Sequence, residues 1–526
     1  MRLRVVAYAI NGRGMGHLVR QLAILRWIRR VCALLEIKLE AWVLTSSEAD
    51  TLARREGFAA LKMPSKAMLR DAGIEPNRQL AVSRAWVLNA IAGLCPDLLL
   101  VDTFPSGSFG ELIAVLELAR RRVLVQREVR PDFEAEESYQ ALLPLYHRRI
   151  VPHSGGVGPI LLREPEELLP REEARKILGV PEGRRALYLT LGGGGDQAAP
   201  QLLPKLVESL GAEHHLVVGA GPLYQGTEVR GPGVTWLSRY TPSELLTGVD
   251  VAVAAGGYNS FHELMAAGVP TVFLPQPRIA DDQLARVRTA VEAGAGRLAR
   301  SWRELPSMLE RAGSPEACRA LVPRGGGLSA ALAALEGLVP EADLELAGRV
   351  LQGPVLRILG RSGTQGLELL RLFAGGPPRQ QAQRRALLLE LRDQGQDVRL
   401  PEEGDAAAAV EAFAMLCEEL SLDLETALGL ASALAKKFPA ASGGDLLRAC
   451  QTLFRAWAPF DDWMGAVSML RAVPTQRSGY GLGGFARDLA AWLGSQDDLF
   501  DALREFARLE DHGRRTVAAV LHELNA

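Results

Sequence analysis

Short runs of apolar residues alternate with amphipathic helical stretches from the N-terminus to about residue 335. Continuous apolar runs of this length are typical of parallel strands that helices cover on both faces. The stretches between them, such as Leu18–Arg30 and Ser260–Ala267, are the crossover helices that a parallel sheet requires. The pattern predicts strands at Leu3–Ala9, Ala41–Thr45, Leu98–Val101, Arg122–Val125, Ala186–Leu191, His215–Gly219, Val249–Ala254 and Thr271–Leu274.

The strand pattern occurs twice. It restarts after a basic helical stretch at Arg171–Leu178, and each series opens with a strand that runs at once into a glycine-rich turn. The two turns are Asn11–His17 and Gly192–Gly195. This repetition predicts two Rossmann-like α/β halves that face each other across a cleft, divided near Pro152–Pro165, rather than one large sheet.

From about Glu341 onward the strand signal disappears, and leucine- and alanine-rich helical patterns take its place. Asp405 is a suitable N-cap, and Phe438-Pro439 is a suitable helix stop. We expect helices at Leu367–Phe373, Ala386–Arg392, Asp405–Leu420 and Leu424–Lys437. The expected domains are therefore residues 1–155, residues 156–338 and an all-α domain at 339–526, to which the pattern assigns no role.

Composition and charge narrow the class of protein. The 526 residues include 60 Lys and Arg against 62 Asp and Glu, so the net charge of −2 gives no global basis for nucleic-acid binding. The five cysteines are scattered and form no CxxC pair, which favours reduced thiols in a cytosol over zinc sites or disulfides. Met1–Ile10 is too short an apolar run for a signal peptide and is expected to be a buried strand.

No apolar run reaches the ~18 residues that a membrane span needs. No strongly basic amphipathic helix requires docking on a membrane surface. We therefore expect a cytoplasmic protein whose contact with the inner face of the membrane is at most peripheral.

The first glycine loop joins a strand to a helix. Glycines permit the tight turn and let backbone amides approach a ligand, and the following helix N-terminus favours negative charge. Gly14 and Gly16 are therefore candidate donor-binding residues. A dinucleotide loop is the weaker interpretation, because the spacing is G-x-G-x-G-H and the second strand ends in Thr45-Ser46-Ser47 rather than an acidic residue.

Two residues of the first half are candidates for a catalytic base. His17 lies where the loop meets the helix and could accept a proton from a hydroxyl, although it could equally do no more than hydrogen-bond the loop. Asp102 follows a strand at the sheet edge where open α/β sheets place ligands. Its alternative role is to cap a helix that starts near Ser108.

The second half carries a more specific set. Its strand at Val249–Ala254 leads into small and polar residues, where a diphosphate could rest on a helix N-terminus. Glu263, about one turn into that helix, could accept hydrogen bonds from both ribose hydroxyls. Each residue alone has an ordinary explanation, but their joint order favours a nucleotide-sugar site. The candidate donor-binding residues here are Gly193, Gly194, Gly256, Gly257, Tyr258, Asn259, Ser260, Glu263, Asp282 and Gln283.

These motifs resemble those of GT-B glycosyltransferases, in particular the N-acetylglucosaminyltransferases that form lipid II and their uncharacterised cousins. The resemblance is carried by Ser238–Pro242, Gly257–Glu263, Ala267–Pro270 and Asp281–Gln283. It implies that Glu263 holds the ribose, that the Gly256–Ser260 loop contacts the phosphates, and that Asp282 and Gln283 contact the donor sugar. It covers residues 1–335 and says nothing of the rest.

The segment Gly14–Arg20 also resembles the G-x-G-H-x-x-R loop of these enzymes and of a related nucleotide-sugar hydrolase. Arg13 departs from the lipid II enzymes, which have a small residue there, and this puts the acceptor in doubt. The charged stretch Gln126–Arg130 follows a strand end and could meet a phosphate, although a solvated charge run is the commoner outcome.

The resemblance predicts an inverting, metal-independent transfer of a sugar from a nucleoside diphosphate, expected to be UDP-linked, to a hydroxyl acceptor. No cofactor is expected beyond this co-substrate. One alternative is a nucleotide-sugar hydrolase in which His17 activates water. Another is a scaffold that binds a protein partner through its helical domain, with an inactive transferase-like core. The sequence leaves the sugar and the acceptor open.

Overall fold

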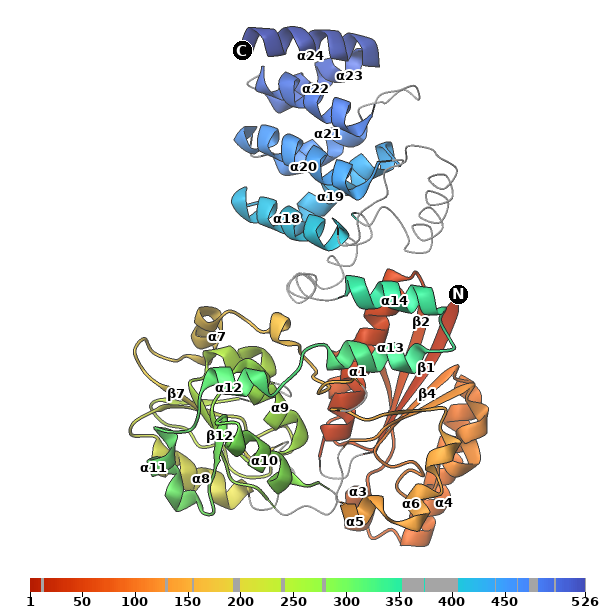
Figure 1. Cartoon of the computed structure of the whole chain (residues 1–526), viewed down its shortest axis with the longest axis vertical. Helices are drawn as coiled ribbons and strands as arrows, with labels where there is room; N and C mark the ends of the chain where they lie inside the picture. Colours follow the sequence, from red (N-terminus) through yellow and green to blue (C-terminus); the bar gives the residue numbers. More distant parts are fainter. Residues whose placement is uncertain are drawn as a thin grey trace. The chain divides into compact units, whose positions relative to one another are not determined.

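The chain divides into two compact units in a computed structural model (Figure 1). Unit 1 comprises Met1–Cys32 and Ile37–Leu344, and unit 2 comprises Ala33–Glu36 and Glu345–Ala526. The structure describes residues 1–10, 14–127, 131–153, 156–192, 199–237, 242–276, 281–351, 373, 405–439, 441–460, 462–472, 481–495 and 498–525. Apart from Phe373, the helices predicted at 367–373 and 386–392 lie outside these residues.

Unit 1 contains two six-stranded parallel sheets with the same kind of topology, and this confirms the predicted pair of Rossmann-like halves. The order of the first sheet is β3-β2-β1-β4-β5-β6, and that of the second is β12-β11-β10-β7-β8-β9. The strands of the first are β1 (Arg2–Ala9), β2 (Lys38–Thr45), β3 (Ala59–Lys62), β4 (Leu98–Asp102), β5 (Arg121–Val125) and β6 (Arg148–Ile150). Those of the second are β7 (Ala186–Thr190), β8 (His215–Val218), β9 (Val234–Trp236), β10 (Val251–Ala254), β11 (Thr271–Phe273) and β12 (Gly296–Leu298).

Helices link the strands of each sheet and cover its faces (Figure 1). Every residue of β4, β7 and β10 is buried, because these central strands have helices on both sides. The helices of unit 1 are α1 (Gly16–Leu34), α2 (Thr51–Arg55), α3 (Lys66–Asp71), α4 (Pro76–Leu94), α5 (Pro131–Glu134), α6 (Glu137–Gln140), α7 (Arg171–Leu178), α8 (Ala199–Leu210), α9 (Tyr258–Ala267), α10 (Gln283–Glu292), α11 (Leu305–Leu309), α12 (Pro315–Ala320) and α13 (Gly326–Leu335). Helix α14 (Glu341–Val350) begins in unit 1 and ends in unit 2.

The sequence analysis missed four strands, and all four lie at sheet edges. These are β3 and β6 in the first sheet and β9 and β12 in the second. They have only three or four residues and are partly exposed, and they include charged side chains such as Lys62, Arg148 and Arg297. An edge strand is covered less completely than a central one, so it needs no continuous apolar run.

The last helix of the two-sheet region, α13, packs against β6 and β4 of the first sheet. Our expected boundaries grouped these residues with the second half. The start of the helix is tightly fitted against the segment between the halves, since a Cβ atom at Gly326 would lie 2.1 Å from the Pro159 carbonyl oxygen. This helix therefore joins the two sheets into one unit.

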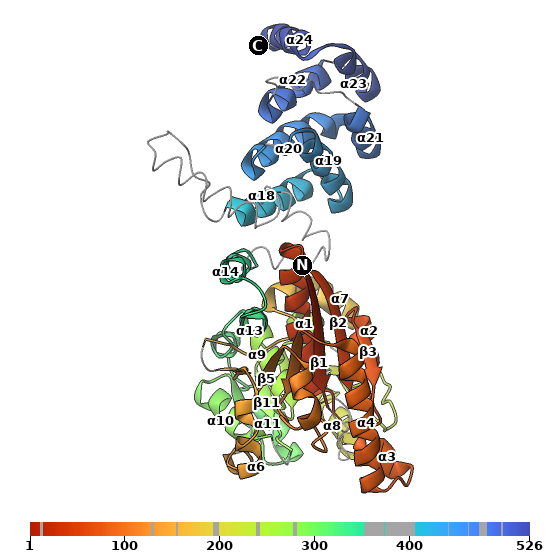
Figure 2. The same ribbon diagram turned by 90° about the vertical axis from the view of Figure 1, so that its right-hand side faces the viewer.

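Unit 2 is helical in its described residues from 405 onward. Its helices are α18 (Asp405–Glu419), α19 (Leu424–Lys437), α20 (Gly443–Trp457), α21 (Trp463–Ala472), α22 (Leu482–Gly494), α23 (Leu499–Arg508) and α24 (Asp511–Asn525). Alternate helices contact one another, so that α18, α20, α22 and α24 form one layer and α19, α21 and α23 form a second (Figure 2). Such stacking is typical of helical-repeat proteins.

The stacked pairs recur at a nearly constant interval that the sequence analysis did not detect. The first helices of successive pairs, α18, α20 and α22, begin 38 and 39 residues apart. The second helices, α19, α21 and α23, begin 39 and 36 residues apart. Such a spacing is within the range of known helical repeats. The repeat escaped notice because apolar positions recur without a shared short motif.

Candidate functional site

The two central strands of the first sheet bring His17 and Asp102 together. Strand β1 leads into α1, which carries His17 and Arg20 in its first turns, and Asp102 is the last residue of the adjacent strand β4. The chain passes from β1 to β2 on one side and returns to β4 on the other. The residues therefore lie at the carboxyl ends of strands where the winding reverses, which is where open α/β sheets form their ligand crevice.

The Asp102 carboxylate is fully buried and surrounded by donors. One oxygen, Oδ1, lies 2.5 Å from Nδ1 of His17 and accepts a 2.7 Å hydrogen bond from the Thr103 hydroxyl. Arg20 donates to both oxygens, from Nε to Oδ2 at 2.7 Å and from Nη2 to Oδ1 at 2.5 Å. The carboxylate is held in one orientation, while the His17 side chain keeps 13% of its surface exposed.

The charge states of this group follow from burial and neighbours. Burial lowers the pKa of His17, against the raising effect of Asp102, and the Arg20 and Arg127 charges lower it further. Although burial opposes it, Arg20 and then His17 hold the pKa of Asp102 well below its usual range. At neutral pH the imidazole is neutral and the carboxylate is charged. With Nδ1–H donated to Asp102, the Nε2 lone pair remains available.

Asp102 was one of two candidates for the base. Its oxygens are buried and fully occupied, so the structure suits it to orienting His17 rather than to accepting a proton itself. The alternative role, capping a helix from Ser108, is wrong. No helix begins there, and the next element is a 3₁₀ turn at Ile113–Leu118.

The second half presents an open helix end at the equivalent place. Helix α9 follows β10, which pairs with β7 at the point where the second sheet reverses its winding. Gly257 is its N-cap, and no side chain caps the helix. Gly256 has a φ of +85°, and a Cβ atom there would lie 2.8 Å from Val287, so only glycine fits. A helix N-terminus without a side-chain cap among the described residues is a suitable place for an anion.

Glu263 lies in α9 and is partly buried. Burial alone raises the pKa of its carboxyl group to about 8. Among the described residues it makes no hydrogen bond and no ion pair. A buried carboxyl group without such a partner is costly unless a ligand supplies one, and this makes Glu263 a candidate binding residue.

The three residues at the start of α9 differ in their surroundings. The Tyr258 ring is buried, and the guanidinium carbons of Arg20 and Arg286 lie 5.0 and 5.5 Å from its centroid. The Tyr258 hydroxyl accepts a hydrogen bond from the Ile160 amide. The Tyr258 side chain therefore packs between the two halves. We expect its contact with the donor to come from the backbone. Asn259 donates to the Gly16 carbonyl at 3.4 Å, while its Oδ1 is buried without a partner. Ser260 is partly buried.

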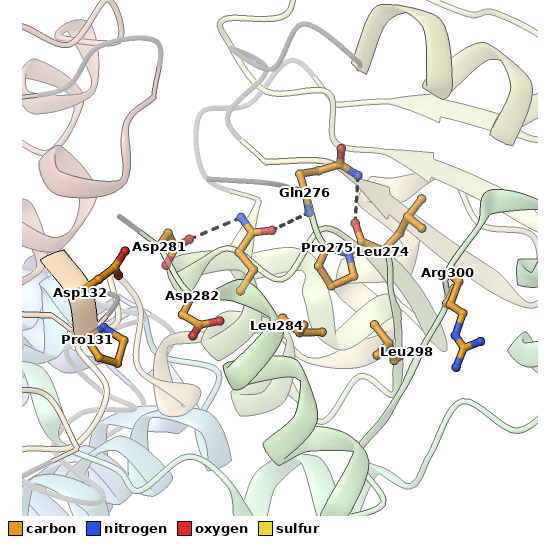
Figure 3. A pocket seen from close by; sticks show the side chains of 12 residues that line it. Pro131, Asp132, Leu274, Pro275, Gln276, Asp281, Asp282, Leu284, Leu298 and Arg300 are labelled. Carbon is orange, nitrogen blue, oxygen red and sulfur yellow. Dashed lines mark hydrogen bonds between the residues drawn. The ribbon is translucent and has the colours of Figure 1, made fainter. Parts of the chain in front are cut away.

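The Asp-Asp-Gln segment after β11 is tied into the fold (Figure 3). Asp282 caps α10 by accepting a hydrogen bond from the Ala285 amide at 2.9 Å. Gln283 is 5% exposed, accepts from the Gln276 amide at 3.0 Å and donates to Asp281 at 3.4 Å. Both candidate donor residues therefore have structural roles in this conformation.

Asp281 connects the halves. It accepts a hydrogen bond from Arg127 at 2.6 Å and another from Arg286 at 3.0 Å. Although burial opposes it, Arg286 and Arg127 hold the pKa of this partly buried carboxyl group below the usual value. Arg127 belongs to the stretch Gln126–Arg130 that we considered for phosphate binding. Its partner in the structure is a carboxylate of the other half.

A cavity of about 770 Å³ adjoins this segment. Its walls come mainly from the ends of β11 and β12 and the start of α10, together with Pro131 and Asp132 of the first half. Figure 3 shows Arg300 at the opposite end from Asp132 and Asp281. The space is large enough for a substrate-sized molecule.

The structure describes some of the remaining predicted residues and not others. The Gly14 carbonyl accepts a hydrogen bond from Ser47, and Gly16 is the first residue of α1. Gly193 and Gly194 lie outside the described residues, as do Arg13 and the segment 238–241. The sequence reasoning missed the roles of Arg20, Asp281 and Arg286. Arg20 was visible as the last residue of the G-x-G-H-x-x-R motif, but its partner was not.

Three further observations concern the described part of the chain. None of the five cysteines forms a disulfide within these residues. No group of three or more His, Cys, Asp or Glu side chains is arranged to hold a metal ion. Within the same residues no helix combines the length and apolar character needed to cross a membrane.

Comparison with known proteins identifies similar sequences. The chain is 29% identical over 123 residues to an uncharacterized glycosyltransferase of Methanopyrus kandleri, covering 23% of this chain and 35% of the relative. It is 26% identical over 167 residues to the UDP-N-acetylglucosamine–N-acetylmuramyl-(pentapeptide) pyrophosphoryl-undecaprenol N-acetylglucosamine transferase of Aquifex aeolicus, covering 31% and 48%. The chain thus spans less than half the length of either relative. No protein-family model matches it.

The solved structures with a similar fold include glycosyltransferases and a putative UDP-N-acetylglucosamine 2-epimerase of Listeria monocytogenes. A Streptomyces glycosyltransferase complexed with thymidine diphosphate has 17% identity and a TM-score of 0.44, covering 64% of this chain and all of its own. MurG of Acinetobacter baumannii has 14% identity and a TM-score of 0.39, covering 66% and 98%. The predicted resemblance to glycosyltransferases is confirmed by the two sequence relatives.

Proposed function

We propose that this relative of the GT-B glycosyltransferases transfers a sugar from a nucleoside diphosphate to a hydroxyl acceptor, with inversion and without a metal. The observation that carries the proposal is the arrangement of two groups in unit 1. His17 and Asp102 form a pair suited to proton transfer, and the Asn259 amide at the start of α9 donates to the carbonyl of Gly16, the residue before His17.

In the proposed reaction His17 is the base. Nε2 takes the proton of the acceptor hydroxyl as its oxygen forms a bond to the anomeric carbon of the donor. The bond between that carbon and the diphosphate oxygen breaks, and the diphosphate leaves with the electron pair. A single displacement from the opposite face inverts the anomeric centre. Asp102 stabilises the imidazolium that forms and fixes its orientation.

The leaving diphosphate needs positive partners. The N-terminus of α9, which has no side-chain cap among the described residues, offers backbone amides and the helix dipole. Around it, ion pairs among the described residues join three guanidinium groups, those of Arg20, Arg127 and Arg286, to two carboxylates, those of Asp102 and Asp281. This excess of positive charge supports metal-independent departure of a diphosphate.

Glu263 would hold the ribose, with its two oxygens accepting one hydrogen bond from each vicinal hydroxyl. Its partly buried carboxyl group has no hydrogen-bond partner among the described residues, as a site awaiting a ligand would. We assign the donor sugar to Gln283 and Asp282. The 3.4 Å hydrogen bond from Gln283 to Asp281 is long enough for a sugar hydroxyl to replace it. A UDP-linked donor is part of this proposal.

A thermal-shift panel of nucleotides and nucleotide sugars tests the donor site. A ligand that binds only the native state raises the apparent stability. UDP-sugars should raise the melting temperature of the wild type, and Glu263→Ala should abolish the rise. Glu316→Ala, which alters a glutamate whose side chain is 81% exposed, is the matched control. A panel in which no nucleotide changes the melting temperature would refute the proposal.

Hydrolysis of the nucleotide sugar is the second candidate, because the same neutral His17 could take a proton from water. The two reactions differ in their products. Transfer should consume the donor only when an acceptor is present, whereas hydrolysis should release free sugar at a rate that cell extract does not change. Measuring free sugar with and without extract separates them.

We also propose a cytoplasmic location with peripheral contact to the membrane. Helices α3 and α4 expose the apolar side chains Met68, Val82 and Leu88, and the same stretch carries Lys66 and Arg70. Apolar side chains next to cationic ones suit an anionic lipid surface. Co-sedimentation with phosphatidylglycerol vesicles should fall for Val82→Asp, and binding that is unchanged would contradict this part.

A protein partner for unit 2 is the remaining proposal. Its stacked helices leave extended surfaces of the kind that repeat proteins use for binding. Met415 of α18 offers an apolar side chain on this surface and is 64% exposed. If a partner docks there, Met415→Asp should abolish its co-purification with the full-length chain while leaving glycosyl transfer intact.

A further inference from the structure

Arg20 is a buried cation whose place in the fold needs an explanation. Only 1% of its surface is exposed, so its charge has been removed from water at considerable cost. Both Nε and Nη2 bond to the Asp102 carboxylate, and Nη2 lies 3.5 Å from the Thr103 hydroxyl. The paired bonds compensate the burial of both charges.

Arg20 and His17 approach the same carboxylate from one helix. They stand three residues apart in α1, so their side chains lie on one face of the helix. Oδ1 of Asp102 receives both the His17 ring nitrogen and Nη2 of Arg20, each at 2.5 Å. The orientation of the imidazole therefore depends on a carboxylate that the arginine fixes.

We propose that Arg20 is a positioning residue for His17: its guanidinium clamps the Asp102 carboxylate in the charged form against Nδ1, so that Nε2 faces the cleft as a proton acceptor. This inference rests on the proposed role of His17 as the base. It assigns to Arg20 a function in the reaction without any contact to the substrate.

The ion pair between Arg20 and Asp102 also sets the charge next to His17. Asp102 and Arg20 together are neutral, so His17 accepts a proton next to a neutral pair rather than next to a lone carboxylate. The charged groups that face the imidazole are Asp102, which raises its pKa, and Arg20 and Arg127, which lower it. Among the described residues, the uncharged Phe104 ring also lies next to the imidazole, with its centroid 5.4 Å away. The arginine thus keeps His17 unprotonated, and ready to act, at a lower pH.

The other side of Arg20 faces the second half. Its guanidinium carbon lies 5.0 Å from the centre of the Tyr258 ring, and Tyr258 is the first residue of α9. Arg286 contacts the same ring at 5.5 Å and bonds to Asp281. The residue that positions the base therefore also contacts the helix proposed to bind the donor.

The test is an NMR titration of the imidazoles in the full-length protein, with the His17 signal assigned by its loss in His17→Gln. Arg20→Gln removes the clamping charge. The pKa of His17 should rise by about 1, because a nearby positive charge has been removed while Asp102 stays. The acid limb of the kcat/KM profile should move up by the same amount, since His17 must be neutral to act. A purely structural role for Arg20 would leave both unchanged.

A matched control removes a paired arginine elsewhere. Arg163 donates from Nη1 and Nη2 to the two oxygens of Glu56, and Arg163→Gln should leave the pKa of His17 unchanged. An equal pKa in wild type and folded Arg20→Gln would overturn the proposal. A pKa that rises while the kcat/KM profile stays fixed would instead show that the clamp exists but that His17 is not the base.

Because Arg20→Gln leaves the Asp102 carboxylate buried without its cation, this variant is the one at greatest risk of misfolding. Arg20→Lys then decides the question, because it keeps the charge but cannot bond to both carboxylate oxygens in the same fork. We expect the pKa of His17 to stay low and kcat to fall about tenfold or more, with the affinity for UDP unchanged. A kcat equal to that of the wild type would overturn the proposal.

Discussion

The two sheets of unit 1 place very different groups at equivalent positions. In the first, the group at the carboxyl ends is complete: His17, Asp102 and Arg20 all have partners within the protein. In the second, Glu263 has no hydrogen-bond partner among the described residues, and the N-terminus of α9 carries no side-chain cap. The same topology therefore supports one site that is assembled in advance and one that is left open.

This contrast fits the two tasks of the proposed reaction. A base must be held in one orientation and charge state before the acceptor arrives, and internal hydrogen bonds achieve this. A ligand-binding group must keep its hydrogen-bonding capacity for the ligand, at some cost in stability. The raised pKa of Glu263, about 8, is a sign of that cost.

The largest expected effect comes from breaking the assembled site. His17→Gln should lower kcat by about 10²–10⁴-fold, the usual contribution of a general base. The affinity for UDP should not change, because the groups proposed to hold the ribose and the diphosphate do not include the His17 side chain. Single-turnover kinetics and calorimetry measure the two quantities. A loss of UDP affinity equal to the loss of rate would mean that the two sites are not separate.

The stability of the open site in the second half should depend on the backbone conformation at Gly256. Gly256→Ala places a Cβ atom 2.8 Å from Val287 at a φ of +85°, so we expect a loss of about 2–4 kcal/mol in the free energy of unfolding. Gly294→Ala is a matched control. It has a φ of +72° but no heavy atom within 4 Å of the new Cβ, and should cost only about 1 kcal/mol. Urea denaturation distinguishes them, and equal losses would contradict the steric argument.

The stability of Glu263→Gln should depend on pH differently from that of the wild type, and this difference tests the cost of the open site. The pKa in the folded state, about 8, exceeds the ordinary value of 4.5, so the folded state binds the proton more tightly than the unfolded state. The wild type therefore loses stability as the pH rises from 4.5 to 8, and the variant lacks this loss. We expect Glu263→Gln to be more stable by about 1–2 kcal/mol at pH 8.5.

The same variant should equal the wild type in stability at pH 4, where both carry a neutral group at this position. Melting temperatures across pH 4–9 measure the difference. A stability gap that does not depend on pH would show that packing, rather than the buried carboxyl group, causes it.

The smallest effect is expected for Arg127→Gln, which removes an ion pair between the halves. Asp281 keeps its second partner, Arg286, so no buried carboxylate is left alone. The cost should be about 1 kcal/mol, because Arg286 remains as a partner and one hydrogen bond is lost from a pair that is only 11% and 14% exposed. Chemical denaturation measures it. A loss above that of Gly256→Ala would show that the bridge, rather than packing, holds the halves together.

How far the sequence predicts the structure depends on the element. The central strands and the helices α1, α7 and α19 follow from local patterns, since burial on both faces demands continuous apolar runs and amphipathic helices repeat every 3.6 residues. The edge strands β3, β6, β9 and β12 have no such demand and were missed. The helical repeat of unit 2 was missed because stacking is set by shape rather than by a short motif.

Some features of the candidate site could likewise be predicted from the sequence, and others could not. The glycine turns, His17 and Glu263 were visible in the sequence because a tight turn and a helix start need particular residues nearby in the chain. The partners were not visible. Asp102 meets Arg20 across 82 residues, and Arg127 meets Asp281 across 154.

The sequence by itself thus determined two α/β halves, a helical region and the residue types at each strand end. Only the tertiary structure decided which of those residues are satisfied and which are left for a ligand. Strand pairing of β1 with β4 places Arg20, His17 and Asp102 together, and burial then fixes their charges. No local pattern specifies such pairings, because they depend on how distant segments pack.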